Sequence, residues 1–113
     1  TDALIQESGK IAAKGFHRVV VREDKDLRGR GYGESARILY EAIAAEVPDC
    51  DCKIIMDESD ALKREITVMR EGDILVCFYE NFDVVRAILE RAEAVPTNQI
   101  KHLSYKNFEL AQA

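Results

Sequence analysis

Short apolar runs alternate with stretches of helical periodicity along this chain, and no other feature restricts its fold as strongly. Hydrophobic residues recur every three or four positions in four stretches, which predicts amphipathic helices at residues 4–12, 36–47, 62–69 and 85–92. Three runs rich in aliphatic residues lie between them and predict strands at 17–22, 53–56 and 73–79. Strands that alternate with helices form a parallel sheet with helices on both faces. We therefore predict an α/β domain with three layers, α/β/α, and a mainly parallel sheet.

The expected helix ends follow from capping and helix-breaking residues. Small polar residues are expected at the starts of the helices and glycine or proline after their ends. Residues 95–113 contain apolar side chains without a convincing period, so a short strand, a short helix and a partly mobile tail all remain open. The expected caps are Thr1 or Asp2, Ser59, and Asn81 or Asp83, and the expected stops are Gly15, Pro48, Gly72 and Pro96.

Length and composition indicate one cytoplasmic domain. A chain of 113 residues is long enough for one hydrophobic core and too short for two domains. The net charge of -5 excludes a strongly basic nucleic-acid-binding domain, and no apolar run reaches the ~20 residues that cross a bilayer. Three cysteines, an odd number, favour a reduced compartment over a disulfide framework. The first residue is not methionine and a helix begins at once, so we expect a piece of a longer polypeptide.

The segment after the first predicted strand is the most unusual in the chain. Residues 23–34 read E-D-K-D-L-R-G-R-G-Y-G-E, in which two arginines alternate with three glycines. Guanidinium groups suit carboxylates and phosphates, glycines allow close backbone approach, and the helix beginning near Glu34 would direct free N–H groups towards an anion. This loop therefore predicts an anion-binding site at the carboxyl edge of the sheet. The alternative is that the charges pair with one another and the glycines only shape a turn.

Several common sites are absent. The glycines Gly29, Gly31 and Gly33 lack the spacing of a dinucleotide fingerprint, and no phosphate loop of the type G-x-x-x-x-G-K-[ST] occurs. Cys50 and Cys52 lack further ligands at metal-binding spacing, and no nucleophile and base can be paired by spacing. We therefore predict no catalytic residue and no metal ligand in this chain.

Residues 9–30, with Gly33 and Glu34, resemble the C-terminal domain of the Mur ligase family. The most specific element is E-D-K-D-L-R-G-R at 23–30, and E-G-D-I-L-V at 71–76 is similar to a strand entry of the same domain. Within the family the similarity is greatest to ligases that add arginine to the side-chain carboxylates of a poly-aspartate backbone. The resemblance implies a Rossmann-like domain that closes over ATP and an incoming amino acid.

The resemblance also implies partners and cofactors. ATP and Mg would be held mainly by a central ATPase domain of the same polypeptide, which supplies the phosphate loop. The resemblance implies an amino acid such as arginine as the incoming substrate and is compatible with a homo-oligomeric full-length enzyme; it implies neither nucleic acid nor a membrane. The isolated domain would be inactive. A stand-alone module that senses an anion or nucleotide, and a pure interaction domain, are the alternatives.

Five of the substrate- or nucleotide-binding residues are expected in this loop, and one, Glu80, follows the third predicted strand. Asp24 and Arg28 match the aspartate and arginine of the family motif D-N-P-R, and Arg30 is an equal candidate for the arginine. Acidic groups at Asp24 and Asp26 would suit a substrate guanidinium, while Arg28 would suit its α-carboxylate. The full set of candidates is Asp24, Lys25, Asp26, Arg28, Arg30 and Glu80.

Overall fold

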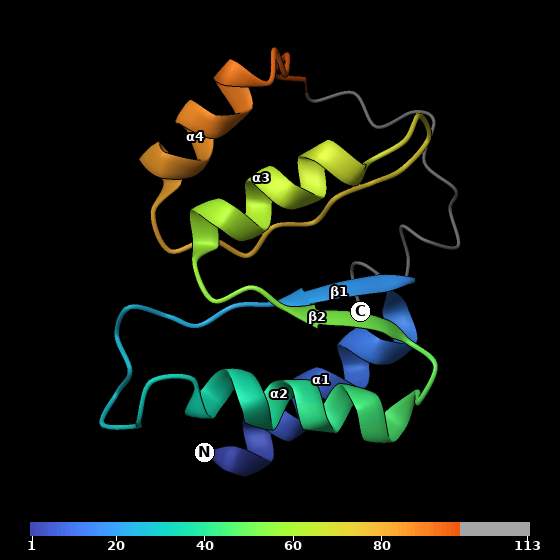
Figure 1. Ribbon diagram of the computed structural model, residues 1–113, viewed down its shortest axis with the longest axis vertical. Helices are drawn as coiled ribbons and strands as arrows, with labels where there is room; N and C mark the ends of the chain where they lie inside the picture. The colour runs from blue at the N-terminus through green and yellow to red at the C-terminus, as the bar shows by residue number, and fades with distance from the viewer. Residues whose placement is uncertain (98–113) are drawn as a thin grey trace.

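The computed structural model describes residues 1–97 and contains four helices and two strands in that range (Figure 1). The predicted alternation of helix and strand is confirmed as far as the second strand. Residues 98–113, which hold most of the segment left open above, lie outside the described residues. The elements are α1 (Asp2–Gly15), β1 (Arg18–Val21), α2 (Glu34–Glu46), β2 (Asp51–Ile54), α3 (Glu58–Val68) and α4 (Phe82–Arg91).

The first two helices and the sheet share one hydrophobic core. Thr1 caps α1 by accepting a hydrogen bond from the N–H of Leu4, as predicted. The core contains Ala13 of α1, Val21 of β1, and Ala36 and Ile43 of α2, and Ile43 is completely buried. The apolar stripe predicted for α2 is buried at Ala36 and Ile43, so burial of apolar area holds this helix against the sheet. The stripe predicted for α1 is wrong: Leu4 and Ile11 are 68% and 64% exposed, and the buried residues of α1 are Gly9 and Ala13.

β1 and β2 form a parallel pair connected by α2. Val19 lies opposite Cys52, and Val21 opposite Ile54. The pairing continues past the strand ends, because the N–H of Ile55 donates to the carbonyl of Val21. The second strand thus begins at Asp51, two residues before the predicted start.

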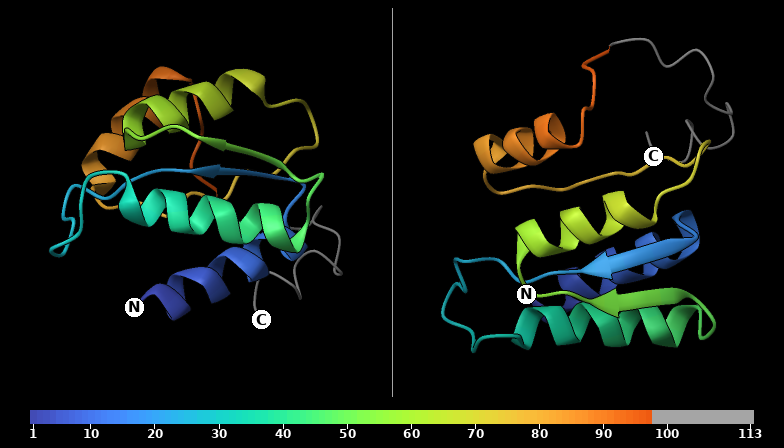
Figure 2. Two further views of the ribbon diagram at one scale, coloured as in Figure 1. Left: turned by 60° about the horizontal axis from the view of Figure 1, so that its bottom comes forward. Right: turned by 45° about the horizontal axis from the view of Figure 1, so that its top comes forward.

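α3 and α4 form a second core on the opposite side of the sheet from α1 and α2 (Figures 1 and 2). Leu62 of α3 packs with Val85 and Ile88 of α4. Asn81 caps α4 by accepting from two backbone N–H groups, which confirms one of the two predicted caps. The prediction of Ser59 as the cap of α3 is wrong: Asp57 accepts from the N–H of Asp60, so the helix begins earlier.

The third predicted strand, residues 73–79, is extended but pairs with no other strand in the described part of the chain. Its side chains alternate as in a strand, because Leu75 and Cys77 line an apolar hollow with α3 and α4. Ile74 and Phe78 point outwards and are 54% and 79% exposed. The predicted third strand therefore does not join the sheet of β1 and β2 within the described residues, and only one face of the segment is covered.

Arg18 connects the sheet to the second core. Its guanidinium donates two hydrogen bonds to the carboxylate of Glu65 on α3 and one, at 2.8 Å, to Asp51 of β2. The hydrogen bonds to Glu65 and Asp51 outweigh desolvation and raise the pKa of Arg18. Within residues 1–97 the domain is a compact α/β unit with four helices and a two-stranded parallel sheet, and none of these helices is long and apolar enough to cross a membrane.

Candidate functional site

The loop between β1 and α2 lies at the carboxyl end of both parallel strands. Figure 1 shows this loop at the same end of the domain as the starts of α3 and α4. In an open α/β sheet this is the edge at which ligands bind. The predicted site residues are therefore at the expected end of the fold, and their contacts decide which of them can reach a ligand.

Arg22 is the centre of an ion-pair network in this region. Its Nη1 lies 2.7 Å from Asp24 Oδ1 and 3.0 Å from Glu80 Oε1, and its Nη2 donates to the carbonyl of Phe78 at 2.8 Å. Burial acts to lower the pKa of Arg22. Its hydrogen bond to Asp24 and the charge of Glu58 raise the pKa by more than burial lowers it, so the net shift is upwards. Asp24 and Glu80, two of the predicted ligand-binding residues, are thus paired with a cation of the protein itself.

Glu80 connects three segments of the chain. Its carboxylate accepts a second hydrogen bond, at 3.1 Å, from the backbone N–H of Lys25. The backbone N–H of Glu80 in turn donates to the carboxylate of Glu58 at the start of α3. The residue therefore holds the loop after β1 close to the segment before α4.

Glu23 caps the first turn of α2 from inside the protein. Its side chain is buried, and its Oε2 accepts from the N–H of Ala36 at 3.4 Å while Oε1 accepts from the N–H of Asp24 at 3.2 Å. The residue at the N-cap position, Gly33, has a φ of 84° and no side chain to cap the helix. The helix start was expected to direct free N–H groups towards an anion, but the protein's own carboxylate already occupies one of them.

The two arginines of the loop have different environments. Arg30 forms ion pairs with Asp2 at 2.6 Å and with Glu34 at 3.6 Å, so its charge is largely satisfied. Arg28 is exposed, and its guanidinium has no hydrogen-bond or ion-pair partner among residues 1–97. The φ of Arg28 is 50°, in the left-handed region that non-glycine residues seldom adopt, and Gly29 follows with 81°. The turn therefore presents Arg28 outwards.

Asp26 and Lys25 complete the predicted set. Asp26 Oδ1 accepts from the backbone N–H of Arg28 at 3.1 Å, which shapes the turn. The ammonium group of Lys25 has no partner in the described range, as for Arg28. Of the six predicted residues, Lys25 and Arg28 can meet an anion directly, Asp26 keeps one carboxylate oxygen without a partner, and the other three are held in internal pairs.

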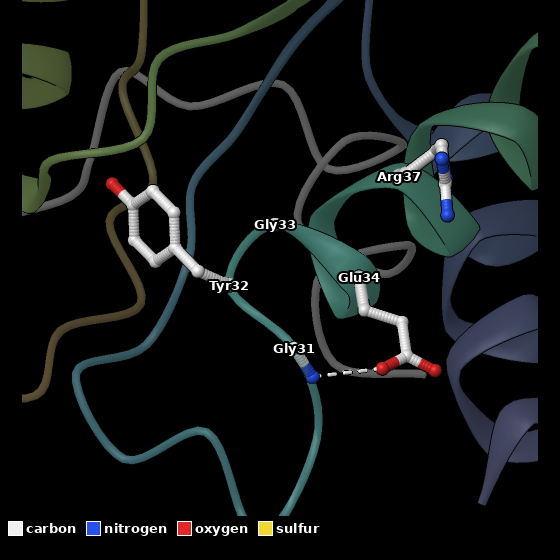
Figure 3. Close-up of a pocket in the computed structure, with 5 residues that line it drawn as sticks. All are labelled: Gly31, Tyr32, Gly33, Glu34 and Arg37. Atoms are coloured by element: carbon white, nitrogen blue, oxygen red, sulfur yellow. Dashed lines mark hydrogen bonds between the residues drawn. The ribbon is translucent and has the colours of Figure 1, made fainter.

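Arg37 is a further basic residue near the loop that the sequence reasoning missed. It lies in the first turn of α2 and, with Gly31, Tyr32, Gly33 and Glu34, lines a hollow of about 290 Å³ (Figure 3). Figure 3 shows Tyr32 directed away from Glu34 and Arg37, and the N–H of Gly31 donating to Glu34 at 2.9 Å. A basic residue four positions after the last glycine of the loop was the signal that could have found it.

The three cysteines are free thiols that are half-buried in the described part of the chain. No group of three or more histidine, cysteine or acidic side chains within residues 1–97 could hold a metal ion. Burial raises the pKa of the Cys52 thiol to about 11, with smaller contributions from Cys50 and Asp51. A thiol of this kind stays protonated at neutral pH and is a poor nucleophile.

The fold and this edge define an α/β domain whose exposed loop offers, at the carboxyl ends of parallel strands, two cations that have no partner among residues 1–97. The chain is similar to a segment of cyanophycin synthetase: it is 40% identical to the enzyme of Crocosphaera subtropica and 38% identical to that of Synechocystis sp., each over 80 residues. The enzyme of Nostoc sp. is 32% identical over the same length. These alignments cover 71% of the chain.

The chain spans about 9% of the length of these curated relatives. No family model matches it, and no solved structure matches it. The similarity is to a domain-sized part of a ligase, and the resemblance to the Mur ligase C-terminal domain stays a prediction.

Proposed function

We propose that this chain is the closing domain of an ATP-dependent ligase of the cyanophycin synthetase type, which forms an amide bond between a carboxylate and an amino acid. The observation that carries the proposal is the similarity to cyanophycin synthetases over 80 residues at up to 40% identity. The two loop cations that have no partner in the described part of the chain support it, because both ATP and an amino acid carry anionic groups that such cations bind.

The residues of the loop divide into two roles in this proposal. Arg28 and Lys25 bind oxygen atoms of the incoming amino acid's carboxylate or of the nucleotide, because their charges have no internal partner in the described range. Asp26 is the acidic residue best placed for a cationic side chain such as that of arginine. Asp24, Arg30 and Glu80 shape the loop through their ion pairs instead of binding substrate.

The residues described here do not fit the magnesium ion of such a reaction. They include no cluster of three metal ligands, and the whole sequence has no phosphate loop. MgATP would therefore be held by a central ATPase domain of the same polypeptide. The ATP would supply the phosphate that activates the acceptor carboxylate. The part of this chain is to orient the amino acid and to exclude water from the site, which raises the rate through positioning.

The test uses the intact polypeptide that contains this chain, with ATP, a poly-aspartate acceptor and labelled arginine. Arg28→Ala is expected to lower kcat/KM at least ~10-fold without changing the unfolding midpoint, because a charge-assisted hydrogen bond to substrate is lost. Arg64→Ala is the matched control, since Arg64 is an exposed arginine on α3 with no partner in the described residues. Arg30→Ala is expected to lower stability through loss of its two ion pairs.

Two results would contradict the proposal. One is the absence of arginine incorporation by the intact wild-type polypeptide. The other is an unchanged kcat/KM in Arg28→Ala. Tight binding of a nucleotide or small acid by the 113-residue chain alone would instead favour the sensor module.

A further inference from the structure

The guanidinium of Arg22 donates three hydrogen bonds at this edge, and neither the motif comparison nor the proposed function assigns it a role. We propose that Arg22 is a positioning residue: it holds the loop 23–30 against residues 78–80 and so determines where Arg28 lies when substrate binds. The inference rests on the proposed function, because it concerns the same loop.

The geometry of Arg22 suits a clamp between two segments. Its guanidinium reaches Asp24 on its own side and both Glu80 and the carbonyl of Phe78 on the other, at distances between 2.7 and 3.0 Å. The side chain is only 18% exposed, so water competes weakly for these bonds. A planar fork with several donors can satisfy acceptors in different directions, which a lysine ammonium cannot do with the same geometry.

The carboxylate of Glu80 connects Arg22 to the backbone of the loop. Glu80 Oε1 accepts from Arg22 and also from the backbone N–H of Lys25 at 3.1 Å. The carboxylate of Glu58 is bonded to the backbone N–H of Glu80, so three acidic groups gather around one guanidinium. Removal of that cation leaves Asp24, Glu58 and Glu80 to repel one another, and the loop is then released from residues 78–80.

Release of the loop would displace Arg28. Arg28 lies four residues beyond Asp24 in the same turn, and its own side chain has no other attachment among residues 1–97. A misplacement of about 1 Å in a binding group can cost ~100-fold in rate. Arg22 therefore acts through the position of Arg28, without contact with the substrate.

The experiment compares Arg22→Gln, Arg22→Lys and Arg18→Gln in the intact polypeptide. Arg18 is the matched control: it is the first residue of β1 and pairs with two carboxylates, whereas Arg22 follows the opposite end of that strand. Trypsin cleavage after Lys25 and Arg28, followed by mass spectrometry, reports release of the loop independently of activity. The KM for arginine reports the position of the binding groups.

Arg22→Gln is expected to speed cleavage in the loop and to raise the KM for arginine about tenfold. Arg22→Lys is expected to give a cleavage rate and a KM between those of Arg22→Gln and the wild type. Arg18→Gln is expected to change neither at a temperature where all variants are folded. Unchanged cleavage and KM in Arg22→Gln would overturn the inference, and so would equal effects of Arg18→Gln, because general loosening would then explain them.

The reference variant Arg28→Ala separates this inference from the proposed function. If Arg28→Ala impairs turnover and Arg22→Gln leaves the KM unchanged, the inference on Arg22 is wrong and the proposed role of the loop stands. If Arg28→Ala has normal turnover, the proposed role of the loop is wrong, and the positioning role of Arg22 is overturned with it.

Discussion

Buried Glu23 occupies a backbone N–H group at the start of α2 that could otherwise bind an anionic ligand. The residue is 8% exposed, and its carboxylate accepts hydrogen bonds from the backbone N–H groups of Asp24 and Ala36. The positive end of the α2 dipole and these N–H groups stabilise a negative charge that lies in the protein instead of a ligand. An incoming anion at this edge must therefore rely on side chains such as Arg28.

Glu23→Ala is expected to lower the free energy of unfolding by about 1–2 kcal/mol, because the first turn of α2 loses its cap. Glu23→Gln should cost less, since the amide oxygen still accepts a hydrogen bond. Urea denaturation measures both, with Glu7→Gln on the exposed face of α1 as the control. An unchanged midpoint in Glu23→Ala would show that the helix start is capped in another way.

At the scale of elements, the most extensive contact in the described domain is that of α1 with α2. Gly9 in the middle of α1 is buried, and a Cβ atom built there would lie 3.0 Å from the Cβ of Ala42 and 3.1 Å from the carbonyl oxygen of Leu39. Glycine is unfavourable in a helix interior by about 1 kcal/mol relative to alanine. The close approach of the two helices explains why a glycine is nevertheless suitable here.

Gly9→Ala is expected to destabilise the protein by about 1 kcal/mol, because the backbone of α2 must move to admit the methyl group and this cost exceeds the gain in helix propensity. Gly15→Ala at the end of the same helix is the control, since no heavy atom lies within 4 Å of its added Cβ. Thermal unfolding of both variants tests the difference. A Gly9→Ala protein more stable than the wild type would contradict this prediction, because it would mean that α2 moves to admit the methyl group without loss of stability.

For the molecule as a whole, two hydrophobic cores lie on either side of a small sheet and are joined by polar contacts. The core of α1, α2 and the strands includes Cys52 at its edge, while the core of α3 and α4 includes Cys77. Burial raises the pKa of both thiols. The stability of the folded chain must therefore depend on pH in the alkaline range.

The direction of this dependence follows from proton counting for Cys52. An unfolded cysteine here has an ordinary pKa of 9.0, whereas the folded thiol has a pKa of about 11. Between pH 9 and pH 11 the unfolded chain loses this proton first, so the stability that the neutral buried thiol contributes is present below pH 9 and is lost as pH rises through 11. Urea midpoints are expected to fall less over this range in Cys52→Ala than in the wild type, and equal falls would contradict the assignment.

Local patterns in the sequence were sufficient to predict most elements. The periodicity of Ile43 and its neighbours predicted α2 because an amphipathic helix can bury its stripe against any apolar surface. Thr1 and Asn81 were predicted as caps because a cap acts on N–H groups two or three residues away. The position of loop 23–33 at the carboxyl end of the sheet followed from the order of strand and helix alone.

The tertiary structure decided what depends on distant residues. Whether residues 73–79 pair as a strand, and whether Arg30 or Arg28 keeps a free charge, depends on partners that are far away in the sequence, such as Asp2 for Arg30. The contact of Arg22 with Glu80 joins residues 58 positions apart, so no local pattern could have predicted it. The sequence by itself therefore determined most of the elements and the position of the loop 23–33, whereas only the packing of those elements decided which charges stay available to a ligand, because an ion pair forms wherever folding brings opposite charges together.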